Sequence, residues 1–203
     1  MRNNFQPERT ILLTFGHDEE VLGNGSKAIV SHLQQQGIRL HAVLDEGGCV
    51  YDGVVPGVNG LAAVIGVAEK GYLSLKFKVT AKGGHSSTPT PETAIGILCR
   101  AIDRLQTHPF PYKVKAILPL FKGLAPALSP TMQMPFANLW LFGGIVRRQL
   151  LSDPETAATI HTTTAPTIIG GGVKNNILPS LAEAVVNFRI LPGESIAQVC
   201  DRV

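Results

Sequence analysis

Two apolar runs that each lead directly into acidic residues constrain the fold of this chain more than any other feature. The first run, Arg9–Phe15, is almost wholly apolar or β-branched after its arginine, and Asp18-Glu19-Glu20 follows it. The second run, Ile38–Leu44, is followed by Asp45-Glu46-Gly47-Gly48. Runs of this kind are typical of strands that are covered on both faces. We therefore predict two buried strands, each with carboxylates at its carboxyl end.

A helix is predicted between these two strands, from a cap at Asn24 or Ser26 to about Gln36. Gly37 is placed to end it. A strand–helix–strand unit belongs to a parallel sheet, in which sites form outside the carboxyl ends of the strands. We expect both acidic clusters at that edge, with a further strand at Gly57–Val67. Composition alone favours a plainer interpretation of the first cluster, a solvated acidic turn.

The residue pattern changes at about residue 70. Along Tyr72–Thr80 apolar and polar residues alternate, which predicts a half-exposed antiparallel strand. A glycine-rich turn, Lys82–Ser87, comes next. A helix is then predicted with Thr90 as its cap and Pro91 at its first position, and it continues to about residue 107.

Residues 108–162 are rich in proline and glycine and have little periodicity, so we predict an insertion with short helices near Pro119–Leu128 and Leu139–Leu150. After it, the pattern predicts two strands and a last helix, at Thr163–Ile169, at Glu183–Ile190 and from Ser195 onward. The order β-α-insertion-β-β-α predicts an α+β, ferredoxin-like domain that needs one more strand. The fold class is therefore α/β, with part of an α/β domain at 1–70 and an α+β domain at 71–203.

Composition narrows the classes of partner. With 44% hydrophobic residues and a net charge of +3, the 203-residue chain can bury a core, and its longest basic block is Arg147-Arg148. Neither a nucleic acid nor a membrane is expected as a partner. The longest apolar segment, Phe136–Val146, falls short of the roughly 20 residues of a spanning helix. Three cysteines without a C-x-x-C pair predict buried, reduced thiols.

Four short motifs occur in order along nearly the whole chain. They are Asp18-Glu19-Glu20-x-x-Gly23, Asp45-Glu46-Gly47, Gly84-His85-Ser86-Ser87, and Asn176-Ile177-Leu178-Pro179 followed by Asn187-Phe188-Arg189. In these motifs the chain resembles the dizinc peptidase family that contains aminoacylase, Gly-X carboxypeptidase (carboxypeptidase S), acetylornithine deacetylase and succinyl-diaminopimelate desuccinylase. Each motif alone is weak, whereas four in the right order are specific. The residues at 16–20, 45–48 and 162–167 are most similar to the carboxypeptidase S branch.

The resemblance implies part of a zinc-peptidase catalytic domain, followed by a dimerisation (lid) domain. It also implies Glu19 as general base and Glu20 as a ligand, in a site with two zinc ions. Adjacent side chains on a strand or tight turn diverge, so one carboxylate can bind metal while the other faces the attacking water. In the second cluster the resemblance puts the ligand on Glu46. Asp45 stays an alternative, because a shift of one residue would exchange the two.

The resemblance assigns His85 to a dimer interface, across which it donates a hydrogen bond to the oxyanion in the partner's active site. Taken alone, a histidine beside a glycine-rich turn is more often an exposed loop residue. Asn176 and Arg189 are implied substrate contacts, since an amide suits a carbonyl and a guanidinium suits a carboxylate. For Arg189 a plain position on the surface of a strand is an equal alternative.

The family pattern also needs a His-x-Asp motif and a bridging aspartate before residue 1, and a histidine after residue 203. We therefore expect a fragment of a homodimeric zinc-dependent metallopeptidase or amidohydrolase. It would cleave the amide bond of N-acyl amino acids or short peptides with a free C-terminal carboxylate, and the isolated chain would be inactive. The alternative is a non-catalytic dimerisation module or a degenerate paralogue. The compartment is left open.

Overall fold

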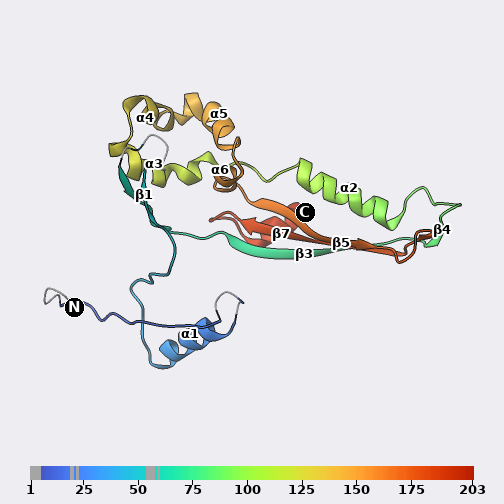
Figure 1. Cartoon of the computed structure of the whole chain (residues 1–203), viewed down its shortest axis with the longest axis horizontal. Coiled ribbons are helices and arrows are strands. Elements are labelled where there is room, and N and C mark those ends of the chain that lie inside the picture. Colours follow the sequence, from blue (N-terminus) through green and yellow to red (C-terminus); the bar gives the residue numbers. More distant parts are fainter. Residues whose placement is uncertain (1–5, 19–20, 22, 54–57, 59) are drawn as a thin grey trace. The chain divides into compact units, whose positions relative to one another are not determined.

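The computed structural model describes residues 6–18, 21, 23–53, 58 and 60–203, so Glu19 and Glu20 lie outside the described residues (Figure 1). The chain divides into two compact units, Met1–Glu46 and Gly47–Val203. The boundary predicted after residue 70 rests on a change of residue pattern and stays a prediction.

The first unit carries the helix α1 (Gly25–Gln35), within two residues of its predicted ends. Gly37 has a φ of 66°, a left-handed conformation that glycine adopts without strain, and it follows the helix as predicted. Asn24 occupies the N-cap position without a side-chain cap hydrogen bond. The N–H groups of the first turn therefore need another acceptor, and Asp18 supplies one.

The two strands predicted in this unit are not formed. Arg9–Phe15 and Ile38–Leu44 have no ladder partner among the described residues, and Phe15 and Leu44 are 87% and 93% exposed. A strand persists only where a neighbour satisfies its main-chain donors and acceptors. Local pattern predicts the preference for a strand but not the presence of that neighbour. The expected sheet edge that would join the two acidic clusters is therefore not seen.

The second unit begins with a short antiparallel hairpin, β1 (Val50–Asp52) with β2 (Leu61–Ala63). The strand predicted at Gly57–Val67 is thus reduced to three residues. The helical insertion predicted at 108–162 is present. Its elements are η2 (Val114–Ile117), α3 (Leu118–Leu124), η3 (Ala125–Ala127), α4 (Pro130–Ala137), α5 (Leu139–Leu150) and α6 (Pro154–Ala158).

The insertion has a small apolar core of its own. Ile117, Val146, Leu150 and Ile160 are buried together, and Tyr112, Phe121 and Phe136 are among the side chains that pack around them. The helices form because they share this core rather than because each is strongly amphipathic. Trp140 of α5 lies outside this core and is 85% exposed.

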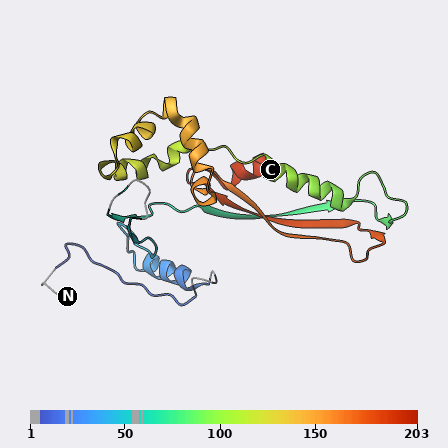
Figure 2. The same ribbon diagram turned by 45° about the horizontal axis from the view of Figure 1, so that its top comes forward.

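An antiparallel sheet forms the long axis of the second unit, with strand order β3 (Gly71–Thr80), β7 (Leu181–Ile190), β5 (Thr163–Gly171) (Figures 1 and 2). All three strands were predicted from their patterns. The central strand β7 pairs with β3 without interruption, from Tyr72 opposite Arg189 to Thr80 opposite Leu181. Its pairing with β5 shifts between Pro166 and Ile168, as a bulge in an edge strand.

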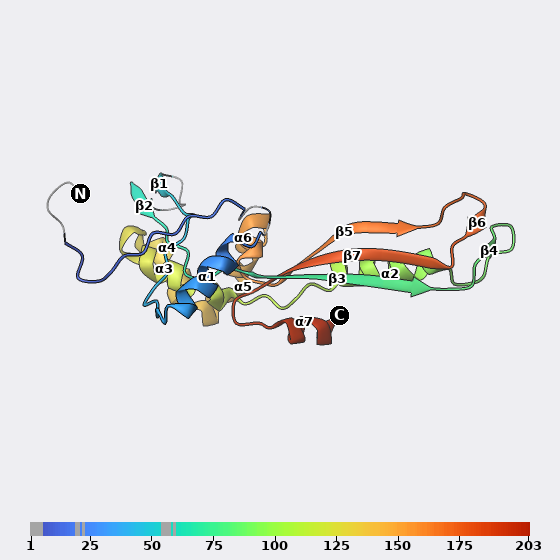
Figure 3. The same cartoon turned by 90° about the horizontal axis from the view of Figure 1, so that it is seen from below.

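Two helices, α2 (Ala94–Thr107) and α7 (Ile196–Arg202), cover one face of this sheet (Figure 3). Ala94 and Leu98 of α2 pack on the first half of β7, and Val199 of α7 packs on the second half. The residues of β7 that face these helices are all buried, namely Ala182, Ala184, Val186, Phe188 and Ile190. The opposite face is mixed, since Lys76 and Lys78 of β3 are exposed there together with Ile168 of β5.

The cap of α2 is Thr93, not Thr90 as predicted. The hydroxyl of Thr93 accepts a hydrogen bond from Gly96 N at 3.1 Å, which places it at the start of the helix. The hydroxyl of Thr90 instead donates to Glu92 O. The last helix does begin after Ser195, in a capping box with Gln198.

Candidate functional site

A two-stranded ribbon at one end of the sheet brings His85 and Asn176 together. In it, β4 (Gly84–His85) pairs with β6 (Ile177–Leu178), and His85 lies opposite Ile177. Ser86 N donates to Asn176 O at 3.0 Å. Figures 1 and 3 show this ribbon, here named the tip, at the end of the sheet away from the helical insertion. Two residues assigned to one site from separate motifs are thus neighbours.

Gly83, just before the His85 motif, allows this close pairing. A Cβ on Gly83 would lie 3.1 Å from Leu178 O, tighter than side chains ordinarily pack. Beyond the pair, Thr88 N donates to His85 O at 3.2 Å and closes a turn. The ring of His85 is exposed, with Nδ1 2.8 Å from Ser87 Oγ and 3.2 Å from Ser87 N.

Arg189 lies at the other end of the sheet. It pairs with Tyr72 and Thr163, and its Cζ is 4.8 Å from the centre of the Tyr72 ring. Leu181, at the tip end of β7, is eight residues away, which at about 3.3 Å per residue is roughly 25 Å. Within one chain, therefore, Arg189 and the pair of His85 and Asn176 do not share a site.

Near Arg189, a group of charged residues joins the insertion to the sheet. Lys70 Nζ donates to Ala158 O and His161 O, each at 2.9 Å. Burial lowers the pKa of Lys70, and Arg189 lowers it further, while Glu194 opposes them. No motif includes these residues, and only contacts across about 90 positions of sequence bring them together.

Glu194 is the centre of this group. Its carboxylate lies 2.6 Å from Lys113 Nζ and accepts a hydrogen bond from the hydroxyl of Thr162, which is fully buried. Thr162 Oγ1 in turn accepts from Leu191 N at 2.8 Å. Burial would raise the pKa of Glu194, but the hydrogen bonds and charge of its partners outweigh that effect and hold the pKa below its usual range.

The two carboxylates of the second acidic cluster, Asp45 and Glu46, are exposed and do not form part of a metal-binding group among the described residues. Asp45 Oδ1 accepts a hydrogen bond from Glu46 N at 3.0 Å, and both residues are exposed. In the part of the chain that the structure describes, no group of three or more His, Cys, Asp or Glu is arranged to hold a metal ion. Because a catalytic zinc usually takes three protein ligands, the described residues alone do not fit a zinc site.

Asp18 has a role that the sequence patterns did not reveal. Its carboxylate accepts a hydrogen bond from Gly25 N at 3.1 Å, at the start of α1, and its main-chain oxygen accepts from Gly23 N at 2.8 Å. A Cβ on Gly23 would lie 2.0 Å from the Asp18 carboxylate. Asp18 is therefore hydrogen-bonded to Gly23 and to Gly25, at the start of α1. Glu19 and Glu20 lie outside the described residues.

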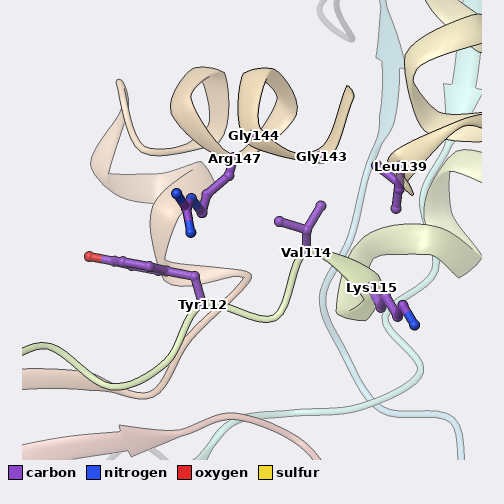
Figure 4. A pocket seen from close by; sticks show the side chains of 7 residues that line it. All are labelled: Tyr112, Val114, Lys115, Leu139, Gly143, Gly144 and Arg147. Atoms are coloured by element: carbon purple, nitrogen blue, oxygen red, sulfur yellow. The ribbon is translucent and has the colours of Figure 1, made fainter. Parts of the chain in front are cut away.

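A shallow pocket of about 310 Å³ opens on the helical insertion, between α5 and the segment that leads into η2 (Figure 4). It is lined by Tyr112, Val114, Lys115, Leu139, Gly143, Gly144 and Arg147. These side chains include two cations and no carboxylate or imidazole, so this pocket has no general base and no metal ligand of the usual kinds. None of the residues that the sequence assigned to the site lines it.

No helix in the described ranges is long and apolar enough to span a bilayer. All three cysteines are free, as predicted, but they are exposed rather than buried. Cys99 lies on α2 and Cys200 on α7.

The second unit combines a three-stranded antiparallel sheet with two helices on one face, and a comparison with known families identifies this region as a peptidase dimerisation domain. The profile of the peptidase dimerisation domain of M20 enzymes matches residues 67–203, and the chain belongs to the M20 peptidase family. The predicted dimerisation domain and the predicted family are thereby confirmed. M20 peptidases are generally metal-dependent.

The relatives are hydrolases. The chain is 40% identical over 206 residues to the N-fatty-acyl-amino acid synthase/hydrolase PM20D1 of Xenopus tropicalis. This alignment covers all of the present chain and 40% of the relative. It is 38% identical to a probable carboxypeptidase S-like 2 of Dictyostelium discoideum, with the same coverage. It is 29% identical to carboxypeptidase S of Saccharomyces cerevisiae, over 98% of this chain and 36% of the relative. The chain thus spans about 40% of the length of the relatives it matches.

Proposed function

We propose that this chain supplies part of the active site and the dimer interface of a metal-dependent hydrolase. The bond cleaved is the amide of an N-acyl amino acid, or of a short peptide with a free C-terminal carboxylate. The family match and the hydrolase names of the relatives support this class of reaction. Because the chain spans about 40% of those relatives, the activity is proposed for a protein of their length.

One observation carries the proposal, namely that the proposed substrate-binding residues occupy opposite ends of one sheet. His85 and Asn176 lie at the tip, and Arg189 lies roughly 25 Å away, beside Tyr72. A small substrate cannot reach both ends of one lid. If all three residues contact the same substrate, they come from two chains, and the active unit is a homodimer with shared sites.

Each proposed residue has a distinct task in that shared site. His85 donates a hydrogen bond to the oxyanion that forms when water adds to the amide carbonyl. Asn176, its neighbour, contacts a carbonyl or carboxylate oxygen of the substrate, and Arg189 pairs with the substrate carboxylate. Glu19 takes the proton of the attacking water and passes it to the leaving amine.

We propose two zinc ions for the complete site, with Glu20 and Glu46 among their ligands and Asp45 as the alternative to Glu46. The described residues do not make such a site by themselves, so its further ligands would have to come from sequence outside this chain. Bound zinc would lower the pKa of a water molecule toward neutrality.

A second candidate function is that of a non-catalytic dimerisation module, and the position of the family match supports it. That match begins at residue 67 and leaves both acidic clusters outside. In this case the acids at 18–20 and 45–46 would be remnants of an active site without function.

A pair of proteins separates the two candidates. The first is this chain alone, which we expect to form dimers in analytical ultracentrifugation but neither to bind zinc tightly nor to hydrolyse N-acyl amino acids. The second is a chimera in which the chain replaces the matching region of the Xenopus relative. We expect this chimera to bind zinc, to hydrolyse N-acyl amino acids, and to lose turnover but keep zinc when Glu19→Gln is introduced.

The control is Glu20→Ala in the same chimera, which should lose zinc as well as turnover. A folded, dimeric chimera without hydrolase activity would favour the non-catalytic module. An active Glu19→Gln chimera would refute the assignment of the general base.

A further inference from the structure

Ser87 contacts the ring of His85 in a way that decides which ring nitrogen carries the proton. The main-chain N–H of Ser87 donates to Nδ1 at 3.2 Å, and the Ser87 hydroxyl lies 2.8 Å from the same atom. A main-chain N–H can only donate, so a neutral ring keeps this bond only when Nδ1 is unprotonated. The hydroxyl, whose proton can rotate, then donates to Nδ1 as well.

The backbone around this contact is fixed from two sides. Thr88 N donates to His85 O, and Ser86 N donates to Asn176 O of the facing strand. The ring and its two donors therefore belong to one turn held against β6. On the other side of the ring, Nε2 has no hydrogen-bond partner in the part of the chain that the structure describes, and the residue is exposed.

We propose that Ser87 is the positioning residue of His85, and that it holds the neutral imidazole as an Nε2–H donor aimed away from its own turn. The relevance to catalysis rests on the proposed role of His85 as the oxyanion donor. A histidine free in water exchanges between two neutral tautomers, and one of them has no proton on Nε2 to donate. Fixing the donor tautomer before the substrate arrives removes that cost from the reaction.

Nitrogen NMR on the 203-residue chain labelled with ¹⁵N tests the proposal directly. At about pH 8 we expect the neutral His85 ring to carry its proton on Nε2 alone. We also expect a through-hydrogen-bond coupling between the Ser87 amide nitrogen and Nδ1. The His85 signals are assigned by their loss in a His85→Gln variant. A ring protonated on Nδ1, or tautomer populations equal to those of a short peptide with residues 83–89, would overturn the proposal.

Two neighbouring serines provide a matched pair of variants. Ser87→Ala keeps the N–H but removes the hydroxyl, so it should raise the population of the Nδ1–H tautomer above that of wild type without reaching that of the short peptide, while Ser87→Thr should restore the wild-type populations. Ser86→Ala is the control, because the Ser86 hydroxyl makes no contact with the ring among the described residues. Populations that respond equally to Ser86→Ala and Ser87→Ala would count against a specific role of Ser87.

Turnover of the chimera separates this proposal from the proposed function. Ser87→Ala should lower kcat by about tenfold, as for other groups that orient an imidazole, with KM unchanged and with recovery in Ser87→Thr. If the NMR signature is present but His85→Ala has wild-type turnover, His85 is not the oxyanion donor, while its positioning by Ser87 stands. If the signature is absent while His85→Ala is inactive, His85 is needed for turnover, but Ser87 does not position it.

Discussion

Glu194 connects three parts of the second unit, namely the helical insertion, the end of β7 and the start of α7. Its side chain is only 10% exposed, yet it forms an ion pair with Lys113 at 2.6 Å and accepts a hydrogen bond from the buried hydroxyl of Thr162. A carboxylate in such a place is costly unless its partners are kept, since an unpaired buried charge loses its hydration without compensation. The insertion is thus attached to the lid by specific polar contacts as well as by packing.

We predict that Glu194 makes stability depend on pH in the acidic range. Its pKa in the folded chain lies below the ordinary value of 4.5, so its contribution is present above about pH 4.5 and is lost as the pH falls through the folded pKa. Glu194→Gln should lower the free energy of unfolding by about 1–3 kcal/mol at pH 7. The difference from wild type should shrink toward pH 3, as measured by urea unfolding at a series of pH values.

Glu92 provides the matched control for this prediction. It pairs with Arg100 at the same distance of 2.6 Å, but the two side chains are 65% and 61% exposed. Glu92→Gln should therefore change stability by less than about 1 kcal/mol at any of these pH values. Equal effects of the two substitutions would show that burial at Glu194 does not matter.

At the level of secondary structure, the start of α2 shows that Thr93 and Thr90, both plausible caps by sequence, have different hydrogen bonds. We predict that Thr93→Ala lowers the free energy of unfolding by about 1 kcal/mol, because Gly96 N loses its acceptor. Thr90→Ala should have little effect, since its hydroxyl contacts only Glu92 O in an exposed loop. Urea unfolding of the two variants decides the matter, and a larger loss in Thr90→Ala would contradict the observed cap.

How far the sequence predicts each element depends on where its determinants lie. The alternation in β3 and β7 and the length of α5 are local properties, and the predicted spans agree with the structure within about two residues. The runs Arg9–Phe15 and Ile38–Leu44 needed a partner strand that local pattern cannot supply. Thr93 and Thr90 differ only in the backbone geometry at the helix start, which composition does not encode.

The same distinction applies to the candidate site. His85 and Asn176 were assigned through motifs, and the pairing of β4 with β6 brings them side by side. The contacts of Ser87, Asp18 and Glu194 depend on particular hydrogen-bond geometry, and no spacing rule marks them. Sequence motifs therefore indicate candidate site residues, whereas the residues that contact and orient them are found only in the structure.

The hydrogen bond between Asp18 and the start of α1 should depend on Gly23. A side chain at that position would meet the Asp18 carboxylate at 2.0 Å, so we predict that Gly23→Ala breaks the hydrogen bond from Gly25 N to Asp18. Hydrogen exchange at the Gly25 amide should become faster as a result. Gly16→Ala is the control in the same segment, because nothing lies within 4 Å of the added Cβ. Unchanged exchange in Gly23→Ala would mean that Asp18 does not protect the Gly25 amide.

For the whole molecule, the distance between the two ends of the lid leads to a test of shared sites. In the chimera with the Xenopus relative, we predict that His85→Ala and Arg189→Ala are each nearly inactive as homodimers. Mixed dimers of the two variants have one site in which both residues are intact, if the two residues of a site come from different chains. Because half of the dimers formed by random mixing are mixed, co-expression should restore about a quarter of the wild-type activity.

The control for this complementation is a double variant, with both substitutions on one chain, that is co-expressed with wild type. Co-expression of the double variant His85→Ala/Arg189→Ala with wild type gives mixed dimers in which each site lacks one residue, so only the wild-type homodimers should be fully active. If His85 and Arg189 of one chain served the same site, the two single variants would not complement each other, and the double variant would leave one site intact in every mixed dimer. Hydrolysis assays on tagged, purified mixed dimers distinguish these outcomes. If the residues of one site come from two chains, the mixed dimer of the two single variants has an intact site. If they come from one chain, the mixed dimer of the double variant with wild type has the intact site instead. The register of β3 with β7 makes the first arrangement the expected one, because it puts Arg189 beside Tyr72 and the tip eight residues farther along the strand.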